Sequence, residues 1–395
     1  MQLLDIVLVL AGLALLTAGG EVLVRGASAL AERLRIPPLV VGLVVVSAAT
    51  STPELAVTVG AILRDEPGLA VGNVVGSNIV NILLILGISA IIVPLAVKRQ
   101  LIRFDVPVMV GMSVLLLLLS LDGQVGLLDG ILLLSGLLVH AFLSVFIGRR
   151  DAKAEGLIAD APLAKTATSN PAANPASKTA QKPVAKPIAL WLALVFIVAG
   201  IGLLVLGAQL LVDGAVSIAS GFGVSSLVIG LTVVAIGTSL PELAASLAAV
   251  RRREGDIAVG NIVGSNIFNI GMVLGVPAII FGQGIPVPAP AIALDMPLMV
   301  AAAVALLPIA FTGFIIARWE GSLFVVLYAA YVVYLVLAST ANDALEGFSN
   351  VMLIFVLPLV GITLIVFTAY EFALQHRKRK ARAEADAANS DDASS

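Results

Sequence analysis

Two short motifs place a carboxylate beside hydroxyl groups and a proline inside long apolar runs. The first reads TSTPE at residues 50–54, and the second reads TSLPE at residues 238–242. On insertion scales, a charged side chain at the centre of a bilayer costs about 2.5–3.5 kcal/mol. The Ser-x-x-Glu spacing is also that of a helix capping box, but a glutamine would complete the box without a charge. We therefore predict that Glu54 and Glu242 have a function beyond capping.

Each proline is expected to interrupt its helix near the middle of the membrane. A proline has no N–H group, and its ring clashes with the carbonyl four residues earlier. Pro53 and Pro241 should therefore disturb the carbonyls just before them, including those of Thr50 and Thr238. Irregular backbone survives at that depth only where protein or a hydrated cavity satisfies it. Carbonyls at the end of such a half-helix are suited to binding a cation.

A second polar motif also occurs twice, as GNVVGSNIVN at residues 72–81 and GNIVGSNIFN at residues 260–269. Side chains four residues apart share one face of a helix. The first copy therefore carries a polar stripe made of Asn73, Ser77 and Asn81. We expect this stripe to face the broken helix and to supply ligands. The remaining asparagines, Asn78 and Asn266, are expected to hold helices together.

Both motifs belong to one internal repeat. Residues 42–87 and 230–275 align without a gap at an offset of 188, and 26 of the 46 positions are identical. Apolar composition alone can produce false self-similarity, but many of these identical residues are polar, glycine or proline. Each copy lies in a set of five predicted spans, an odd number, so the halves should be inverted across the membrane. Inverted repeats with interrupted helices are typical of secondary transporters.

The elements that position these motifs must be membrane-spanning helices. Of the 395 residues, 59% are apolar and only 12% are charged, against about 25% charged in a typical soluble protein. This balance excludes an ordinary soluble enzyme, a disordered chain and a nucleic-acid-binding protein. Apolar runs of spanning length, about 20 residues, are predicted at 3–29, 38–63, 68–95, 104–120, 126–148, 188–212, 225–250, 256–281, 291–312, 322–338 and 350–373.

Lysine and arginine predict the orientation, because they concentrate in loops on the cytoplasmic side. Assigning loops alternately along the eleven spans puts 22 of the 23 basic residues on one side and leaves Arg64 on the other. The N-terminus is therefore predicted to lie outside and the C-terminal tail inside. The first apolar run has no basic flank ahead of it, which favours a retained helix over a cleaved signal peptide.

The predicted fold is an all-α polytopic membrane protein with two inverted five-helix repeats, a ten-helix core, and an additional C-terminal transmembrane helix. Its predicted parts are a first repeat at 1–150, a flexible cytoplasmic linker at 151–187, a second repeat at 188–338, the extra helix at 339–374 and a cytoplasmic tail at 375–395. The linker is assigned from its alanine, proline, lysine, serine and threonine content and its lack of hydrophobic periodicity.

The donor atoms in the motifs are all oxygens. The chain has no cysteine and only two histidines, His140 and His376, and His140 is expected to be an interface or packing residue. Oxygen-only sites suit hard cations such as Ca²⁺ and Na⁺. Two carboxylates neutralise one Ca²⁺ or two Na⁺. The charge of one cavity is therefore balanced by either set of ions but not by both at once. Such competition is the physical basis of an exchanger.

The motifs GTSxPE and GNxxGSNxxN resemble those of the two α-repeats of the Ca²⁺/cation antiporter superfamily, specifically of the prokaryotic sodium/calcium exchangers. The resemblance implies a ten-helix core that exchanges extracellular Na⁺ for cytosolic Ca²⁺. It implies that Ca²⁺ is bound by the carboxylates of Glu54 and Glu242. By the same resemblance, the backbone carbonyls of Thr50 and Thr238 are the other Ca²⁺ ligands. The flanking Na⁺ sites would be formed by side chains and backbone of Ser47, Ser51, Ser77, Ala235, Ser239 and Ser265.

The chain departs from the pattern of some family members. Asn81 and Asn269, also expected to be ligands, are both amides where some members carry an aspartate at one of these positions. The site then has two negative charges instead of three, which leaves the Na⁺ stoichiometry and any participation of protons open. Ala49 precedes Thr50 in place of the usual glycine. The linker is too short for the large regulatory Ca²⁺-binding domains of animal exchangers, and the eleventh helix has no counterpart in the first half.

The alternative within transport is Ca²⁺/H⁺ or K⁺-coupled exchange, because buried glutamates can also bind protons. An intramembrane metalloenzyme is less favoured, since it would need nitrogen ligands or a nucleophile–base pair. A scaffold protein would have no need of duplicated carboxylates at membrane depth. We therefore predict a monomeric antiporter of the cytoplasmic (inner) membrane that is not an enzyme and has no cofactor. Its partners are Ca²⁺, Na⁺ and the lipid bilayer, and no nucleic acid is expected.

Overall fold

The apolar runs fold into helices, most of them long enough to cross a membrane. The structure, a computed structural model, describes residues 3–34, 36–154, 188–221, 235–311, 314–340 and 344–356, with positions 358 and 361. In this part of the chain nine helices have the length and composition of a membrane span. Five belong to the first predicted repeat and four to the second. The other span of the second repeat, predicted at 225–250, is described only from Ala235.

The first repeat begins with α1 (Leu3–Leu34) and ends with α8 (Leu127–Ala154). Its second span consists of α2 (Pro38–Val40), the π-helical segment η1 (Val41–Val46), α3 (Ser47–Thr50) and α4 (Thr52–Leu63). Its third span consists of α5 (Pro67–Ile79), the π-helical η2 (Val80–Leu86) and α6 (Gly87–Ile92). Its fourth span consists of the π-helical η3 (Leu101–Asp105), α7 (Val106–Leu119) and a short 3-10 turn, η4 (Ser120–Asp122).

The second repeat follows the same order. It begins with α9 (Leu190–Gly221), and the described part of its second span consists of α11 (Ala235–Thr238) and α12 (Leu240–Arg251). Its third span consists of α13 (Gly255–Phe268), the π-helical η6 (Asn269–Leu274) and α14 (Gly275–Phe281). Its last two spans are η7 (Ala291–Asp295) with α15 (Met296–Phe311), and α16 (Arg318–Ser339). Two pairs of π-helical segments, η2 with η6 and η3 with η7, therefore lie at matched positions in the two halves.

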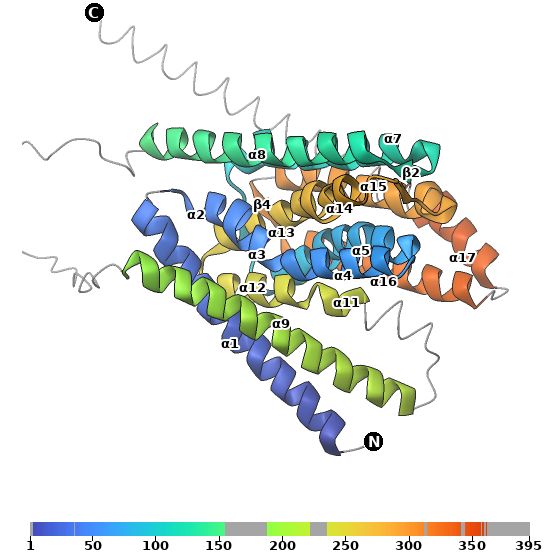
Figure 1. Cartoon of the computed structure of the whole chain (residues 1–395), viewed down its shortest axis with the longest axis horizontal. Coiled ribbons are helices and arrows are strands. Elements are labelled where there is room, and N and C mark those ends of the chain that lie inside the picture. The colour runs from blue at the N-terminus through green and yellow to red at the C-terminus, as the bar shows by residue number, and fades with distance from the viewer. Residues whose placement is uncertain are drawn as a thin grey trace, which may run out of the picture.

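The packing of α1 against α9 shows that the repeats are inverted. Glycines recur every seven residues on both helices, at Gly12, Gly19 and Gly26 and at Gly200, Gly207 and Gly214. A Cβ on Gly12 would lie 2.7 Å from the Gly207 carbonyl oxygen, and a Cβ on Gly26 would lie 2.8 Å from that of Ala193. Contacts thus move towards the start of α9 as they move towards the end of α1, so these equivalent helices are antiparallel (Figure 1). Small residues permit this close approach.

Two short strand pairs join the loops of one repeat to those of the other. β1 (Leu95–Ala96) pairs with β4 (Ile315–Ile316), and β2 (Gln124–Val125) pairs with β3 (Ile285–Pro286), both antiparallel. β3 follows β1 at an offset of 190, and β4 follows β2 at an offset of 191. The two pairs are therefore equivalent under the repeat, and they connect the halves at two places.

Helix ends differ from the predicted boundaries in several places. α8 continues to Ala154, so the helix enters the range assigned to the linker. α16 begins at Arg318, four residues before the predicted 322, because Glu320 accepts a hydrogen bond from the Ala317 N–H at 2.7 Å and caps the helix. α17 (Ala344–Val351) and η8 (Met352–Val356) begin ahead of the predicted eleventh span. Most of that span, the linker from residue 155 and the tail lie outside the described residues.

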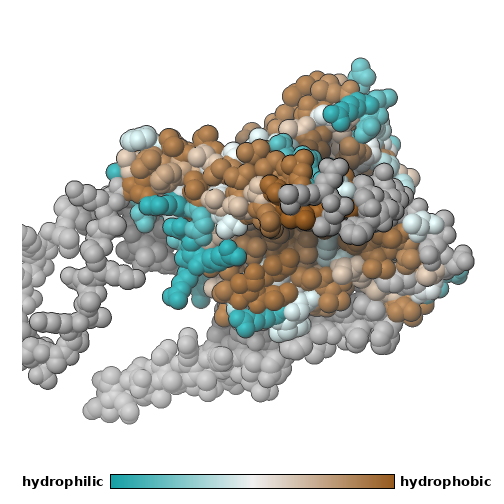
Figure 2. All heavy atoms as spheres, turned by 90° about the horizontal axis from the view of Figure 1, so that it is seen from below, coloured by the Kyte–Doolittle hydropathy of each residue, from teal (hydrophilic) through white to brown (hydrophobic). Residues whose placement is uncertain are grey.

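Large apolar side chains cover much of the outer surface. Leu128, Phe142 and Trp191 are 77%, 72% and 67% exposed. Figure 2 shows a mostly hydrophobic face on which hydrophilic residues gather in patches towards the edges. Soluble monomers rarely expose contiguous apolar surface on this scale. The surface therefore fits a protein embedded in lipid, as its composition predicted.

Candidate cation site

Both TSxPE motifs break their helices at the serine. α3 ends at Thr50 and α4 begins at Thr52, and Ser51 between them has φ −81° and ψ 0°. α11 and α12 are separated in the same way by Ser239, with φ −93° and ψ 10°. The proline at the second position of each new helix lacks the N–H that would continue the preceding one. The prediction of two interrupted helices is confirmed.

The two glutamates are buried at the start of the second half-helices. Glu54 is 1% exposed and Glu242 is 0% exposed. Their four carboxylate oxygens have no hydrogen-bond partner among the described residues. The two groups are also close enough to interact electrostatically. Burying two carboxylates together without donors is strongly unfavourable, so this pair requires a cation or bound protons.

Each broken helix packs against the asparagine-bearing span of the other repeat. In the first repeat, α3 contacts α13, and α4 contacts η6, which begins at Asn269. In the second repeat, α11 contacts α5, and α12 contacts η2, which contains Asn81. The candidate site therefore lies at the interface between the inverted repeats. Transporters of this architecture bind their substrates at such an interface.

Hydroxyl groups from both repeats meet at Asn261. Thr50 Oγ1 donates to Asn261 Oδ1 at 3.3 Å and lies 3.4 Å from Ser265 Oγ. Ser47 Oγ donates to the Asn261 carbonyl oxygen at 2.9 Å. The structure thus brings together three residues predicted from the sequence, Ser47, Thr50 and Ser265, although Ser265 lies more than 200 positions from the other two.

The first asparagine of each polar stripe holds the broken helix of its own repeat. Asn73 Nδ2 donates to the Glu54 carbonyl oxygen at 3.2 Å and to Thr58 Oγ1 at 3.0 Å. Asn261 Nδ2 donates to Ser246 Oγ at 3.2 Å. The sequence interpretation missed these hydroxyl residues. Both occur four residues after a motif glutamate, and that matched spacing is the signal that could have identified them.

The last asparagines of the two stripes have different surroundings. Both side-chain atoms of Asn81 are buried without a partner among the described residues. Asn269 Nδ2 instead donates to Asn78 Oδ1 at 3.1 Å, and its Oδ1 has no described partner. Asn78 Nδ2 donates to the Asn266 carbonyl oxygen at 3.3 Å, so Asn78 does connect the repeats. Both Asn81 and Asn269 therefore keep an amide oxygen available.

The remaining predicted residues lie on the same elements. The hydroxyl groups of Ser51 and Ser239 are buried without a described partner. Ser77 is buried on α5, which contacts α11. Thr238 is half-buried at the end of α11, and Ala235 is the first described residue of that helix. The donor set consists of carboxylate, amide, hydroxyl and carbonyl oxygens, which suits Ca²⁺ or Na⁺.

Paired carboxylates at the interface of two inverted repeats, each on a broken membrane helix, define a polytopic transporter of cations. The family model described as "Sodium/calcium exchanger protein" matches this chain over residues 4–146 and 192–337. The chain belongs to the sodium/calcium exchanger family. It is therefore a transporter and not an enzyme, and the two matched segments coincide with its two repeats.

Individual relatives extend over most of the chain. The inner membrane protein YrbG of Escherichia coli is 40% identical over 279 residues, which cover 71% of this chain and 81% of YrbG. The sodium/calcium exchanger MaX1 of Methanosarcina acetivorans is 30% identical over 354 residues, covering 84% of this chain and 98% of MaX1. A structure of the sodium-calcium exchanger NCX_Mj soaked with Na⁺ and Ca²⁺ superposes with a TM-score of 0.68 at 32% identity, covering 84% of this chain and 99% of that one.

Proposed function

We propose that the protein is a secondary active antiporter that exchanges Na⁺ for Ca²⁺ across the cytoplasmic membrane. The observation that carries this proposal is the pair of buried carboxylates, Glu54 and Glu242, without a described protein donor at the repeat interface. A divalent cation neutralises both charges, and two monovalent cations do the same. MaX1 and NCX_Mj are named sodium/calcium exchangers, which supports this choice of ions.

Alternating access would follow from the inverted architecture. In one state the site opens to one side, and exchanging the conformations of the two repeats opens it to the other. The predicted ligands are the carboxylates of Glu54 and Glu242, the carbonyls of Thr50 and Thr238, and the amide oxygens of Asn81 and Asn269. Ser47, Ser51, Ser77, Ala235, Ser239 and Ser265 would form the flanking Na⁺ positions. YrbG is an inner membrane protein, which supports the same location for this chain.

A second candidate is Ca²⁺ exchange coupled to H⁺ or K⁺. The amides at Asn81 and Asn269 leave the site with two acidic groups. This charge is compatible with either H⁺ or K⁺ as the counter-ion. Protons could occupy the unpartnered carboxylates in the absence of a cation. Sodium remains the first choice because MaX1 and NCX_Mj, which match this chain over most of its length, are named sodium/calcium exchangers.

Flux measurements in liposomes separate these possibilities. The purified protein is reconstituted, and ⁴⁵Ca²⁺ uptake is driven by an outward gradient of Na⁺, K⁺ or H⁺ tested separately. We expect the Na⁺ gradient alone to drive uptake, and a protonophore to leave the rate unchanged. Uptake that responds only to the pH gradient or only to K⁺ would show that the sodium assignment is wrong.

A further inference from the structure

An asparagine outside the predicted donor set is hydrogen-bonded to one that belongs to it. Asn78 lies on α5 and was expected only to hold helices together, whereas Asn269 is a predicted ligand. Asn269 Nδ2 donates to Asn78 Oδ1 at 3.1 Å, and both residues are 0% exposed. Among the described residues, Asn269 Oδ1 has no hydrogen-bond partner. The contact with Asn78 therefore holds one end of this amide and leaves the other end free.

The two ends of an asparagine amide have opposite roles in a cation site. Oδ1 is an acceptor that suits a hard cation, whereas Nδ2 carries two donor hydrogens and cannot bind one. Half a turn about the last side-chain torsion exchanges the two ends. Asn269 begins η6, and η6 packs against α4, the helix that carries Glu54. The direction of this amide therefore decides whether an oxygen or an NH₂ group is presented to the cation.

The orientation of Asn78 is fixed by two acceptors from the second repeat. Its Nδ2 donates to the Asn266 carbonyl oxygen at 3.3 Å and to Met299 Sδ at 3.4 Å. A backbone carbonyl and a thioether sulfur can accept a hydrogen bond but cannot donate one. The reversed orientation of Asn78 would therefore lose both bonds and place its oxygen against these acceptors. Its Oδ1 must face Asn269, and Asn269 must answer this acceptor with Nδ2.

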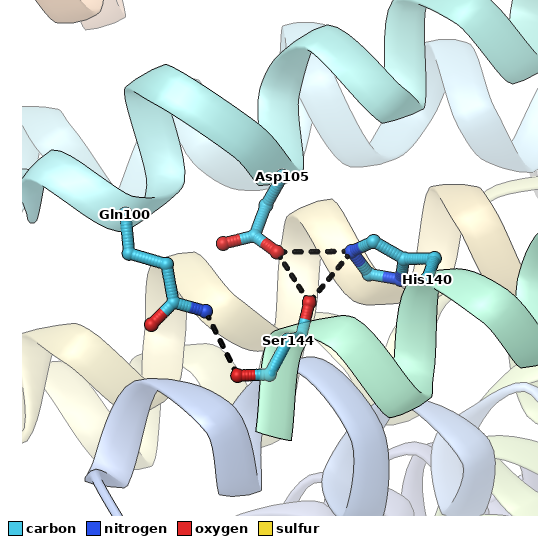
Figure 3. Close-up of polar contacts among 4 residues, drawn as sticks. All are labelled: Gln100, Asp105, His140 and Ser144. Atoms are coloured by element: carbon cyan, nitrogen blue, oxygen red, sulfur yellow. Dashed lines mark hydrogen bonds and ion pairs between the residues drawn. The ribbon is translucent and has the colours of Figure 1, made fainter. Parts of the chain in front are cut away.

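The helix that carries Asn269 is held in place by its other neighbours. η6 packs against α8, and a buried polar cluster ties α8 to η3 of the same repeat (Figure 3). In this cluster His140 Nε2 lies 2.9 Å from Asp105 Oδ1, and Ser144 Oγ donates to the same oxygen at 2.6 Å. The backbone position of η6 is thus supported separately. The contact with Asn78 is left to select the direction of one side chain.

The equivalent asparagine of the second repeat makes no such contact. Asn266 follows Asn78 at an offset of 188, in the same GSN sequence. Its Nδ2 donates to the Ile262 carbonyl oxygen of its own helix at 2.8 Å. Asn81, the equivalent of Asn269, has no described partner for either side-chain atom. Two identical sequence motifs therefore give one oriented amide and one that is not held by a described neighbour.

We propose that Asn78 is a positioning residue of the cation site, which directs the oxygen of Asn269 towards the bound Ca²⁺. A ligand that is already turned towards the ion does not have to be reoriented when the ion binds, which increases affinity. Asn81 lacks this support, so the two repeats contribute unequally to binding. The inference rests on the proposed function, because it requires Asn269 to be a Ca²⁺ ligand.

Asn78→Leu provides the first test, because leucine branches at the same carbon and cannot accept a hydrogen bond. Without its acceptor, the Asn269 amide should turn its NH₂ group to the site part of the time. We expect the Kd for Ca²⁺ to rise by about threefold to tenfold, the effect of one hydrogen bond. The measurement is calorimetric titration of the purified full chain with Ca²⁺ in detergent without Na⁺.

The matched control is Asn266→Leu, at the equivalent position of the other repeat. Its Kd should stay within about twofold of that of the unmodified protein, because the Asn266 side chain bonds only to its own helix among the described residues. An unchanged Kd in Asn78→Leu, or an equal rise in both variants, would overturn the proposal.

The Asn269→Asp background separates orientation from packing. A carboxylate presents an oxygen whichever way it is turned, so it needs no partner to direct it. Adding Asn78→Leu to Asn269→Asp should therefore change the Kd by less than about twofold. A rise as large as in the unmodified background would show that Asn78 acts through packing, and the positioning role would be wrong.

Two further outcomes are distinguishable. If Asn78→Leu fails to fold, Asn78→Ala takes its place in both backgrounds, since alanine is too short to reach Asn269. An unmodified protein that binds no Ca²⁺ would overturn the proposed function and this inference with it. Ca²⁺ binding that is intact in the unmodified protein and equal in all Asn78 variants would overturn the inference alone.

Discussion

At the scale of single residues, the unusual feature is two carboxylates whose four oxygens are buried without a described donor. Some polar side chains around them are held by hydrogen bonds, such as Asn73 at 3.0–3.2 Å and Asn261 at 3.2 Å. The hydroxyls of Ser51 and Ser239 and the amide of Asn81 have no described partner, so Glu54 and Glu242 are left open to a ligand together with these groups. Such preorganised oxygens are what a hard cation requires.

Glu54→Gln and Glu242→Gln are each expected to reduce Ca²⁺ exchange to background while protein abundance stays near normal. Glutamine keeps the volume and removes one of the two charges that neutralise Ca²⁺. The measurement is Na⁺-driven ⁴⁵Ca²⁺ uptake in liposomes, with the exposed Glu66→Gln as the matched control. Exchange retained in either site variant would contradict the assignment of the site.

Asn269→Asp adds a third carboxylate, and we expect it to change ion coupling without abolishing Ca²⁺ binding. The additional charge should be balanced by a further monovalent cation, so the dependence of exchange on Na⁺ concentration should become steeper. Asn81→Asp, where the amide has no described partner, tests the equivalent position. Initial rates over a series of Na⁺ concentrations provide the measurement, and an unchanged Na⁺ dependence in both variants would refute the charge argument.

At the scale of helices, the fold relies on interruptions placed at matched positions. The two broken helices bring hydroxyls and carboxylates to the repeat interface, and π-helical segments begin at or beside Asn81 and Asn269. π-helical segments are frequent at functional sites because they redirect side chains within a helix. Glycines provide the other requirement, which is close approach of helix backbones.

Gly200→Ala should destabilise the protein by about 1–3 kcal/mol, the usual cost of overpacking. A Cβ at Gly200 would lie 2.6 Å from the backbone nitrogen of Leu23 on α1. The control is Gly202→Ala, two residues further along α9, where no atom lies within 4 Å of the added Cβ. Thermal unfolding in detergent should show a lower Tm for Gly200→Ala alone. Equal Tm values for the two variants would mean that α1 and α9 are not packed as described.

At the scale of the whole molecule, the inverted repeat makes the two halves equivalent in structure but opposite in orientation. This relation is visible in the antiparallel contact of α1 and α9. It is also visible in the two strand pairs, each of which joins a strand of one repeat to a strand of the other. The turns that follow α4 and α12 are also equivalent, since Asp65 and Arg253 both adopt positive φ, 58° and 63°. Equivalent positions should therefore lie on opposite sides of the membrane.

Single cysteines test this topology in a chain that has none of its own. Leu63 and Arg251 are equivalent at the offset of 188, and both are exposed. We expect a membrane-impermeant maleimide to label Leu63→Cys in intact cells and Arg251→Cys only after the membrane is opened. Labelling of both positions from the same side would refute the inverted topology, and the opposite pattern would reverse the predicted orientation.

Much of this protein could be predicted from local patterns in its sequence. The length of the apolar runs predicts membrane helices, Pro53 and Pro241 predict the breaks, and the offset of 188 predicts the repeat. The inversion followed from an odd number of spans and is now evident in the packing of α1 against α9. These features depend on hydrophobicity and backbone chemistry within one segment, which the sequence displays directly.

Only the tertiary structure decided which polar groups meet, because that depends on how each helix is rotated and which helix it crosses. Thr50 reaches Asn261 of the other repeat, and Asn269 is tied to Asn78. His140 was expected to be an interface or packing residue, and it is buried, but its partner Asp105 lies on another helix and could not be identified from the sequence. The sequence by itself determined a duplicated, inverted membrane protein with two carboxylates at its centre. The packing of its helices determined the surroundings of those carboxylates and formed a second buried polar cluster in the first repeat.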